Sequence, residues 1–189
     1  MYLDTAERTL LAKQDRIDYL VEQLYTTTEG GILGSYIMDL PLHNPTKELI
    51  WVTQRSDVNN YNDWTNYTNR HSYNRNYPIL KSAKILFNGF DRFEEKPAAY
   101  FNLLQPFQHH TNSPREGIYV YSFALHPEKS APSGTCNMSM LQKTQLYVTT
   151  NAIDTTDVNP KYEYEVTVYS LSYNIFRVMS GSGSMVFAN

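Results

Sequence analysis

The chain has 189 residues, enough for one domain or two small ones, and 41% of them are apolar, a fraction typical of globular rather than disordered proteins. Sixteen lysines and arginines against nineteen aspartates and glutamates give a net charge of −3, which argues against a nucleic-acid-binding groove. The single cysteine, Cys136, excludes an internal disulfide framework, and no apolar stretch approaches the roughly 20 residues of a membrane-spanning helix.

The first predicted element is a short helix that begins after Asp4 and ends near Lys13. Asp4 can cap this helix and Glu7 follows three residues later, which is the spacing of a capping box. Leu10 and Leu11 are then expected to face the core. The charged residues of this segment also interrupt any apolar run near the first residue, so we expect no secretory signal peptide there.

Eight further segments predict β-strands, because apolar and aromatic residues alternate with polar ones or stand between turn signals. In chain order they are Ile17–Tyr25, Ser35–Leu42, Lys47–Gln54, Ile79–Phe87, Gly117–Leu125, Met140–Thr150, Tyr162–Met179 and Ser184–Ala188. The dipeptides Asn44-Pro45 and Asn88-Gly89 predict turns next to the second and fourth of these strands.

Two connections between the strands are long enough to be described separately. Residues Ser56–Tyr77 are rich in Asn and Tyr and lack apolar periodicity, and a loop of this length is usually functional or disordered. A second short helix is expected to begin at Pro97, where the missing N–H of proline costs nothing, and to continue through Phe101. We expect Pro106 to end it.

Many strands separated by turns, with few helices, indicate a sandwich or a barrel. The fold class predicted here is all-β: an eight-stranded antiparallel jelly-roll sandwich with two short helices. An immunoglobulin-like sandwich is the alternative, but it usually needs only about 100 residues for its strands, and the loops of this chain are longer.

His109 and His110 are the first candidates for chemistry. Adjacent residues of an extended chain point to opposite sides, so both imidazoles cannot easily hold one metal ion. A cupin-type site requires His-x-His followed by a glutamate, and although Glu116 lies nearby, the histidine spacing is wrong. We therefore expect no metal here, and expect both imidazoles to hydrogen-bond to the backbone near the start of the strand at Gly117.

The other reactive groups lack a local signature. Cys136 could pair with His43 or His126 as a nucleophile and its base, but a buried, inert thiol is the simpler expectation. Glu94 and Glu95 are adjacent and therefore splayed, which suits a solvated helix start better than a general-acid pair. The sequence thus predicts no catalytic residue, no cofactor and no metal.

Two N-glycosylation sequons occur, Asn66-Tyr67-Thr68 and Asn137-Met138-Ser139. Such motifs matter only on a secretory route. Asn66 is the better glycan candidate, because its loop is expected to be exposed.

Four long segments carry a resemblance to a known family. They are "HNPTKELIWVTQR" (43–55), "LFNGFDRFEEKPAAYFNLLQPFQHHT" (86–111), "GIYVYSFALHPEKSAPSGTCNMS" (117–139) and "YNIFRVMSGSGSMVFAN" (173–189). In this order they closely resemble the C-terminal half of the major capsid protein of nucleocytoplasmic large DNA viruses. Members of that family are double jelly rolls. The resemblance implies that residues 1–189 form a single C-terminal jelly-roll domain, and that the N-terminal jelly roll is absent from this chain.

The resemblance also implies a topology. The eight segments become strands B to I, with B, I, D and G in one sheet and C, H, E and F in the other. The stretch Ser56–Tyr77 becomes the D–E loop and Pro127–Ser139 the F–G loop, both facing outward on the capsomer. "QPFQHHT" (105–111) then lies in the E–F connection, where it shapes a corner and catalyses nothing.

The function implied is that of a structural, non-enzymatic protein that builds an icosahedral shell through trimeric, pseudo-hexagonal capsomers. Its partners would be two further copies in a homotrimer, neighbouring capsomers, minor capsid and penton proteins, and the missing N-terminal jelly roll. The resemblance implies no direct contact with nucleic acid, and an inner viral membrane that lies beneath the shell without being entered. The protein would be located in the virion capsid, and in the host cytoplasm during assembly.

Two other functions compete with a shell protein. Trp51, Trp64 and the abundant tyrosines could stack on sugars, as in a carbohydrate-binding jelly-roll module that attaches to a host through its surface loops. A cupin-like metalloenzyme is the third possibility, for which the histidine spacing is unfavourable.

Overall fold

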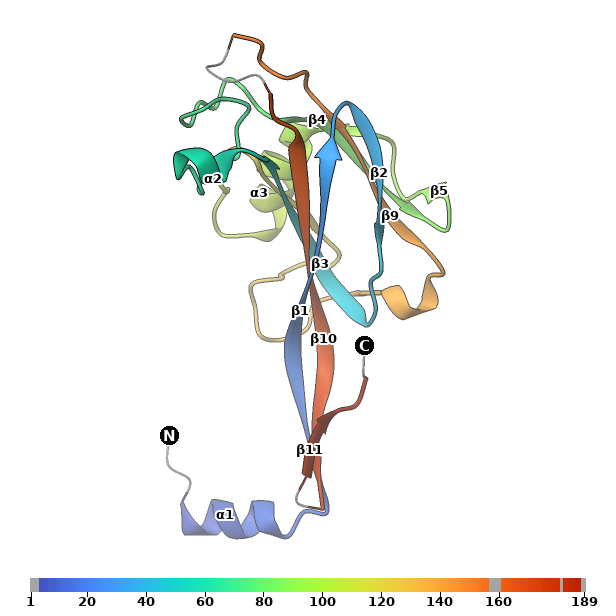
Figure 1. The fold of residues 1–189 in the computed structure, drawn as a ribbon. Coiled ribbons are helices and arrows are strands. Elements are labelled where there is room, and N and C mark those ends of the chain that lie inside the picture. The colour runs from blue at the N-terminus through green and yellow to red at the C-terminus, as the bar shows by residue number, and fades with distance from the viewer. Residues whose placement is uncertain (1–3, 157–160, 181, 188–189) are drawn as a thin grey trace.

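The computed structural model describes residues 4–156, 161–180 and 182–187. Within them, strands form two antiparallel sheets that face each other, as Figure 1 shows. In spatial order, the first sheet consists of β1 (Arg16–Ile32), β10 (Tyr164–Met179), β3 (Pro45–Arg55) and β7 (Ile118–Ser122), with β11 (Ser182–Met185) on β10 and β8 (Cys136–Asn137) on β3. The second consists of β2 (Ser35–Leu40), β9 (Thr144–Thr150), β4 (Leu80–Phe87) and β5 (Phe90–Asp91), with β6 (Lys96–Pro97) on β4.

This strand order confirms the jelly roll. The first sheet has the order B-I-D-G and the second the order C-H-E-F, if β5 takes the F position. The hairpin before β5 is the predicted one, since Asn88 and Gly89 both have positive φ, as a type I′ turn requires.

The strand letters expected from the sequence are wrong after strand E. The F strand is only the dipeptide Phe90–Asp91, which is too short to leave a periodic pattern. The segments expected as F, G and H are therefore G, H and I, because β7 pairs with β3 and β9 pairs with β2 and β4. The last predicted strand corresponds to β11, an addition beside β10, and Ala188 lies outside the described residues.

Two loop assignments change with the letters. The stretch Pro127–Ser139 belongs to the G–H connection, and "QPFQHHT" (105–111) lies between F and G. The assignment of Ser56–Tyr77 as the D–E loop holds, since this stretch joins β3 to β4.

The core forms where the inner faces of the two sheets meet. Along β9 every second residue is buried, and the same alternation appears in the second half of β3. Trp51 of β3 is fully buried between Phe101, whose ring centroid lies at 5.0 Å, and Tyr119 of β7 at 6.0 Å. Opposite sheet residues such as Ile85 and Leu146 complete this cluster.

The first helix, α1 (Thr5–Ala12), confirms the predicted capping box, since Asp4 accepts from Thr5 N–H and Glu7 accepts from the Asp4 N–H. The expectation that Leu10 and Leu11 face the core is wrong. None of the residues of α1 is buried, and Leu10 is 64% exposed. In Figure 1, α1 lies at the far end of a ribbon that projects from the sandwich, so the core is out of its reach.

The second helix begins one residue late and runs past Pro106. It begins at Ala98 and Ala99, directly after β6, and continues as a π-helical turn, η1 (Tyr100–Leu104), and then as α3 (Gln105–His109). The Gln105 N–H donates to the Tyr100 carbonyl, five residues back. This wider turn makes room for the ring of Pro106, which in a regular α-helix would clash with the carbonyl four residues earlier. The sequence-based stop at Pro106 is therefore wrong.

Two short helices were not predicted, α2 (Val58–Tyr61) in the D–E loop and the 3-10 turn η2 (Met138–Met140) before β9. None of the helices in residues 4–156, 161–180 and 182–187 combines the length and the apolar character needed to cross a membrane.

The buried indole of Trp51 gives a direct test of the core. We expect Trp51→Ala to lower the free energy of unfolding by about 3–5 kcal/mol, because it removes a large side chain from between two packed rings. Phe90→Ala is the matched control, since Phe90 is 79% exposed and its loss should change stability by no more than about 0.5 kcal/mol. Urea unfolding of both variants measures the difference, and equal losses would contradict this account of the core.

Candidate functional site

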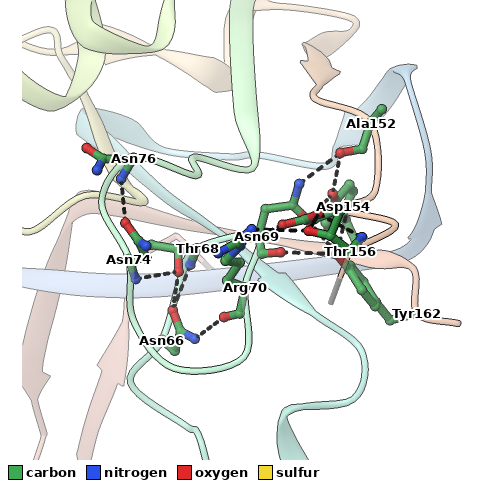
Figure 2. A network of polar contacts seen from close by, with 11 residues as sticks. Asn66, Thr68, Asn69, Arg70, Asn74, Asn76, Ala152, Asp154, Thr156 and Tyr162 are labelled. Atoms are coloured by element: carbon green, nitrogen blue, oxygen red, sulfur yellow. Dashed lines mark hydrogen bonds and ion pairs between the residues drawn. The ribbon is translucent and has the colours of Figure 1, made fainter. Parts of the chain in front are cut away.

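The first candidate site is a polar network that joins the D–E loop to the connection between β9 and β10 (Figure 2). Asn69 is its centre and is 4% exposed. Its Nδ2 donates to the Ala152 carbonyl at 2.8 Å, and its Oδ1 accepts from the hydroxyls of Tyr162 at 2.6 Å and Tyr164 at 2.5 Å. One amide side chain therefore holds two segments that are about 80 residues apart in sequence.

An ion pair extends this network toward solvent. Arg70 Nε lies 2.6 Å from Asp154 Oδ2, and the Arg70 guanidinium stacks on the ring of Tyr77 with its carbon 3.8 Å from the ring centroid. Hydrogen bonds from Thr156 and from Arg70 lower the pKa of Asp154 to about 2. Asp154 therefore stays ionised at any physiological pH, so protonation does not break this ion pair.

Asn66 lies inside the D–E loop, and the expectation that it is exposed is wrong. It is 3% exposed, its Nδ2 donates to Asp63 and to the Arg70 carbonyl at 2.6 Å each, and its Oδ1 accepts from the N–H and hydroxyl of Thr68. A glycan would have to attach to this same Nδ2. The glycan itself stays a prediction. The second sequon differs, because Asn137 in β8 is exposed.

A close approach of backbones holds the same loop against β7. Gly117 has a φ of +91°, and a Cβ placed on it would overlap the Cβ and carbonyl of Tyr67. A glycine is needed here both for its conformation and for the missing side chain. The loop Ser56–Tyr77 is therefore a packed structure, tied down on two sides.

The histidines expected as a backbone-bonded pair behave differently from each other. His109 ends α3 and its Nδ1 lies 3.1 Å from the Leu125 carbonyl, a backbone partner as expected, although Leu125 follows the end of β7 rather than preceding its start. His110 instead contacts two carboxylates, with Nε2 at 3.0 Å from Glu48 and Nδ1 at 3.3 Å from Glu128. The premise of an extended chain was wrong, because this segment is helical up to His109.

Glu116, the third residue of the metal site considered above, is partly buried, and burial raises the pKa of its carboxyl group. Among the residues that the structure describes, no three His, Cys, Asp or Glu side chains are arranged to hold a metal ion. The absence of a metal and of a cofactor stays a prediction.

The remaining sequence candidates are Cys136 and the acidic pair Glu94 and Glu95. Cys136 is half-buried in β8, and burial raises the pKa of its thiol, which disfavours the nucleophilic thiolate. Glu94 lies 3.8 Å from Lys96, and Glu95 accepts from the hydroxyls of Ser82 and Thr149. Both acidic residues precede β6 rather than a helix, so their expected position at a helix start is wrong.

The aromatic residues that suggested sugar binding are separated as well. Trp51 is fully buried in the core, so it cannot stack on a ligand. Trp64 in the D–E loop is 56% exposed. Of the two tryptophans that suggested carbohydrate binding, Trp64 alone is therefore accessible to a sugar.

The second candidate site is apolar and lies at the other end of the molecule. β3 pairs with β10 only between Tyr164 and Ser172, so beyond that point β10 has β1 and β11 as neighbours, forming the ribbon that Figure 1 shows below the sandwich. Large apolar side chains of this ribbon are 36–54% exposed, namely Tyr19, Leu20, Phe176, Met179 and Met185. Leu24, which is 59% exposed, lies opposite Leu171 where the ribbon joins the sandwich.

The strand register places these side chains on both faces of the ribbon. Leu20 is paired with Ile175, and Tyr19 with Phe176, and successive residues of a strand point to opposite faces. Apolar side chains exposed on both faces of a sheet make it a candidate interaction surface. At its tip, Asp18 contacts Arg177 at 2.8 Å, and hydrogen bonds from Arg177 and Arg16 hold the pKa of Asp18 well below its usual range.

An apolar cleft of about 550 Å³ lies on the outer side of the second helix. Its lining includes Pro97, Tyr100, Leu103, Leu104 and Phe107, and Phe107 is 81% exposed. A β-sandwich with one polar loop end and two apolar surfaces presents surfaces of the kind that subunits of an assembly bury against one another.

Comparison with known families decides the relationship. Residues 7–184 match the family described as large eukaryotic DNA virus major capsid protein. The chain belongs to this capsid protein family. A major capsid protein of Pyramimonas orientalis virus is 36% identical, over all of this chain and 47% of that protein. A major capsid protein of Paramecium bursaria Chlorella virus 1 is 33% identical, over all of this chain and 52% of that protein.

Solved structures give the same relationship. The chain matches a subunit in a quasi-atomic description of the PBCV-1 virus capsid with a TM-score of 0.80 and 29% identity, over all of this chain and 55% of that one. The Faustovirus major capsid protein shares the fold, with a TM-score of 0.68 at 13% identity. The chain thus spans about half the length of these curated capsid relatives.

Sequence reasoning about this capsid family member missed its buried polar residues. Asn69 stood in a stretch of alternating Asn and Tyr that gave no sign of which amide is central. Lys47 and Glu48 are 3% and 4% exposed although they are consecutive charges. One feature of the sequence could have indicated this burial. Lys47 and Glu48 are two consecutive charged residues inside a strand that otherwise alternates, and a buried charge needs an oppositely charged partner from elsewhere in the chain.

The central role of Asn69 in this capsid domain can be tested by truncation. We expect Asn69→Ala to cost about 1–3 kcal/mol of unfolding free energy, because buried hydroxyl and carbonyl groups lose a partner. Asn76→Ala is the control, since Asn76 is exposed in the same loop and should change stability by no more than about 0.5 kcal/mol. Chemical denaturation measures both, and an Asn76 effect as large as that of Asn69 would contradict the network.

Gly117 offers a second test with a matched glycine. Gly89→Ala should lower the free energy of unfolding by about 1–2 kcal/mol, because the φ of Gly89 is +83°. No steric cost is added, since nothing lies within 4 Å of the new Cβ. Gly117→Ala should lower the free energy of unfolding by about 1–3 kcal/mol more than Gly89→Ala does, because its Cβ also overlaps Tyr67. Thermal unfolding compares the two. If they destabilise equally, the loop is not packed on β7 as described.

Proposed function

We propose that this chain is a structural, non-enzymatic subunit of the icosahedral capsid of a large DNA virus, present in the virion and assembled in the host cytoplasm. The match of its entire length to a PBCV-1 capsid subunit, at a TM-score of 0.80, is the observation that carries the proposal. The two-layer sandwich suits this role, because face-to-face sheets give a rigid body with few moving parts.

We further propose that residues 1–189 act as a C-terminal jelly roll that works together with an N-terminal one. The length of the curated relatives supports this, since the chain corresponds to about half of each of two full-length matches. The ribbon supports it too, because a projecting sheet with apolar side chains on both faces is stable in water only when covered.

In this proposal three such chains form a pseudo-hexagonal capsomer, and the capsomer contacts neighbouring capsomers, minor capsid proteins and penton proteins. The net charge of −3 favours neither binding to the genome nor adhesion to an anionic membrane surface. The inner membrane would lie beneath the shell without being entered.

Ribbon variants test this proposal. In a polypeptide that carries both jelly rolls, analytical ultracentrifugation should show a trimer, and Leu20→Glu with Leu24→Glu should raise its dissociation constant at least about tenfold, because each exposed leucine loses apolar burial. The two leucines are 54% and 59% exposed in the isolated jelly roll.

Leu33→Glu is the matched control. Leu33 is 52% exposed but lies at the β1–β2 turn, away from the ribbon, so this variant should keep the trimer. A clean monomer of the unaltered protein at high concentration would refute the capsomer. An equal effect of Leu33→Glu would remove the ribbon from the interface.

A further inference from the structure

His110 lies where three segments of the fold meet. It follows the last residue of α3, and its imidazole contacts Glu48 on β3 and Glu128 in the connection between β7 and β8. Nε2 is 3.0 Å from Glu48 Oε2, and Nδ1 is 3.3 Å from Glu128 Oε1. The side chain of Glu48 is 6% exposed and that of His110 is 15% exposed.

This geometry selects the charged form of the imidazole. Nε2 and Glu48 Oε2 are within ion-pair distance without being aligned for a hydrogen bond, whereas Nδ1 is hydrogen-bonded to Glu128. Only the imidazolium carries a positive charge, so the ion pair with the Glu48 carboxylate forms only after protonation. If His110 lost its proton, the nearly buried carboxylate of Glu48 would be left as a charge without an ion-pair partner. An unpaired buried charge destabilises the fold, because little water is present to solvate it. The contact with Glu48 accordingly raises the pKa of His110, as does the weaker contact with Glu128.

We propose that His110 is a pH-sensitive latch that holds residues 126–133 against the sandwich while it is protonated and loosens them when it loses its proton. This proposal does not depend on the capsid function.

The other contacts of this loop explain why the latch would loosen it without unfolding the protein. Glu128 also accepts from the Thr111 N–H at 3.1 Å, which lowers the pKa of its carboxyl group. Lys47, the remaining charged group beside the loop on β3, donates to the Pro127 carbonyl at 2.8 Å and to Glu22 on β1. These contacts do not involve the imidazole of His110, so loss of its proton leaves them in place.

A cleft of about 570 Å³ lies between this loop and the ribbon, so movement of the loop would change the shape of the cleft. Pro127, Glu128 and Ser130 form one wall, and another is formed by Leu20 and Tyr173 of the ribbon with Leu171 at the junction of ribbon and sandwich. Movement of the loop would therefore widen or narrow access to one apolar face of the ribbon.

The direction of the pH effect follows from the raised pKa. A group whose pKa is higher in the folded than in the unfolded protein stabilises the fold fully below the unfolded value, which is about 6.5 for histidine. This stabilisation is lost as the pH rises through the folded pKa. The latch is thus closed in mildly acidic solution and open in alkaline solution.

Hydrogen exchange of residues 126–133 between pH 5.5 and pH 9 tests the latch, after correction for the intrinsic pH dependence of exchange. In the unaltered chain, corrected exchange should rise several-fold across the titration. His110→Asn, which cannot be charged, should exchange fast at every pH, and His110→Lys, which keeps its charge, should exchange slowly at every pH. His126→Asn is the control, because His126 is exposed within the same loop and should leave the profile unchanged.

Histidine resonances followed by NMR provide a readout that loop packing alone would not move. His110 should titrate above 6.5 in the unaltered chain and at a lower pH in Glu128→Gln. A His110 pKa at or below 6.5, a flat exchange profile, or a His110→Asn profile that keeps the original pH dependence would each overturn the latch.

Discussion

Neither sheet of this fold can exist alone, because each has one face of apolar side chains that must be kept from water. The alternation along β9 and β3 sends every second residue into the space between the sheets, where Trp51 lies between two further aromatic rings. The loops, the ribbon and the second helix are all attached to the strands whose positions this contact determines. The jelly roll is therefore a solution to mutual burial first, and a scaffold for surfaces second.

The loop end of the molecule is ordered by a different force. Amide and hydroxyl groups around Asn69 satisfy one another inside the D–E loop, and a close contact at Gly117 holds the loop on β7. Buried polar groups that are fully paired define one arrangement more sharply than apolar packing does, because any other arrangement leaves some of them without partners. A long loop without apolar periodicity can in this way be as well defined as a strand.

The sequence predicted the fold class because alternation and the Asn88-Gly89 turn are local signals. It misplaced strand F because Phe90–Asp91 is too short to show a period, and it ended the second helix at Pro106 because a π-turn leaves no mark in the residue pattern. The candidate site was harder to predict from the sequence than the fold. The partners of Glu48 and Asn69 come from segments far away in the chain, so their burial could be recognised only once the strands were placed.

β10 belongs to two structures at once, since its first half lies in the sandwich and its second half in the projecting ribbon. Its ladder with β1 runs from the pair Arg16–Met179 to the pair Ile32–Tyr164, and the hydrogen bonds of such a ladder lie across the strands. A tension applied along the ribbon therefore shears many of these bonds together instead of opening them one after another. The projection can pass mechanical load from a neighbouring body directly into the rigid centre of the domain.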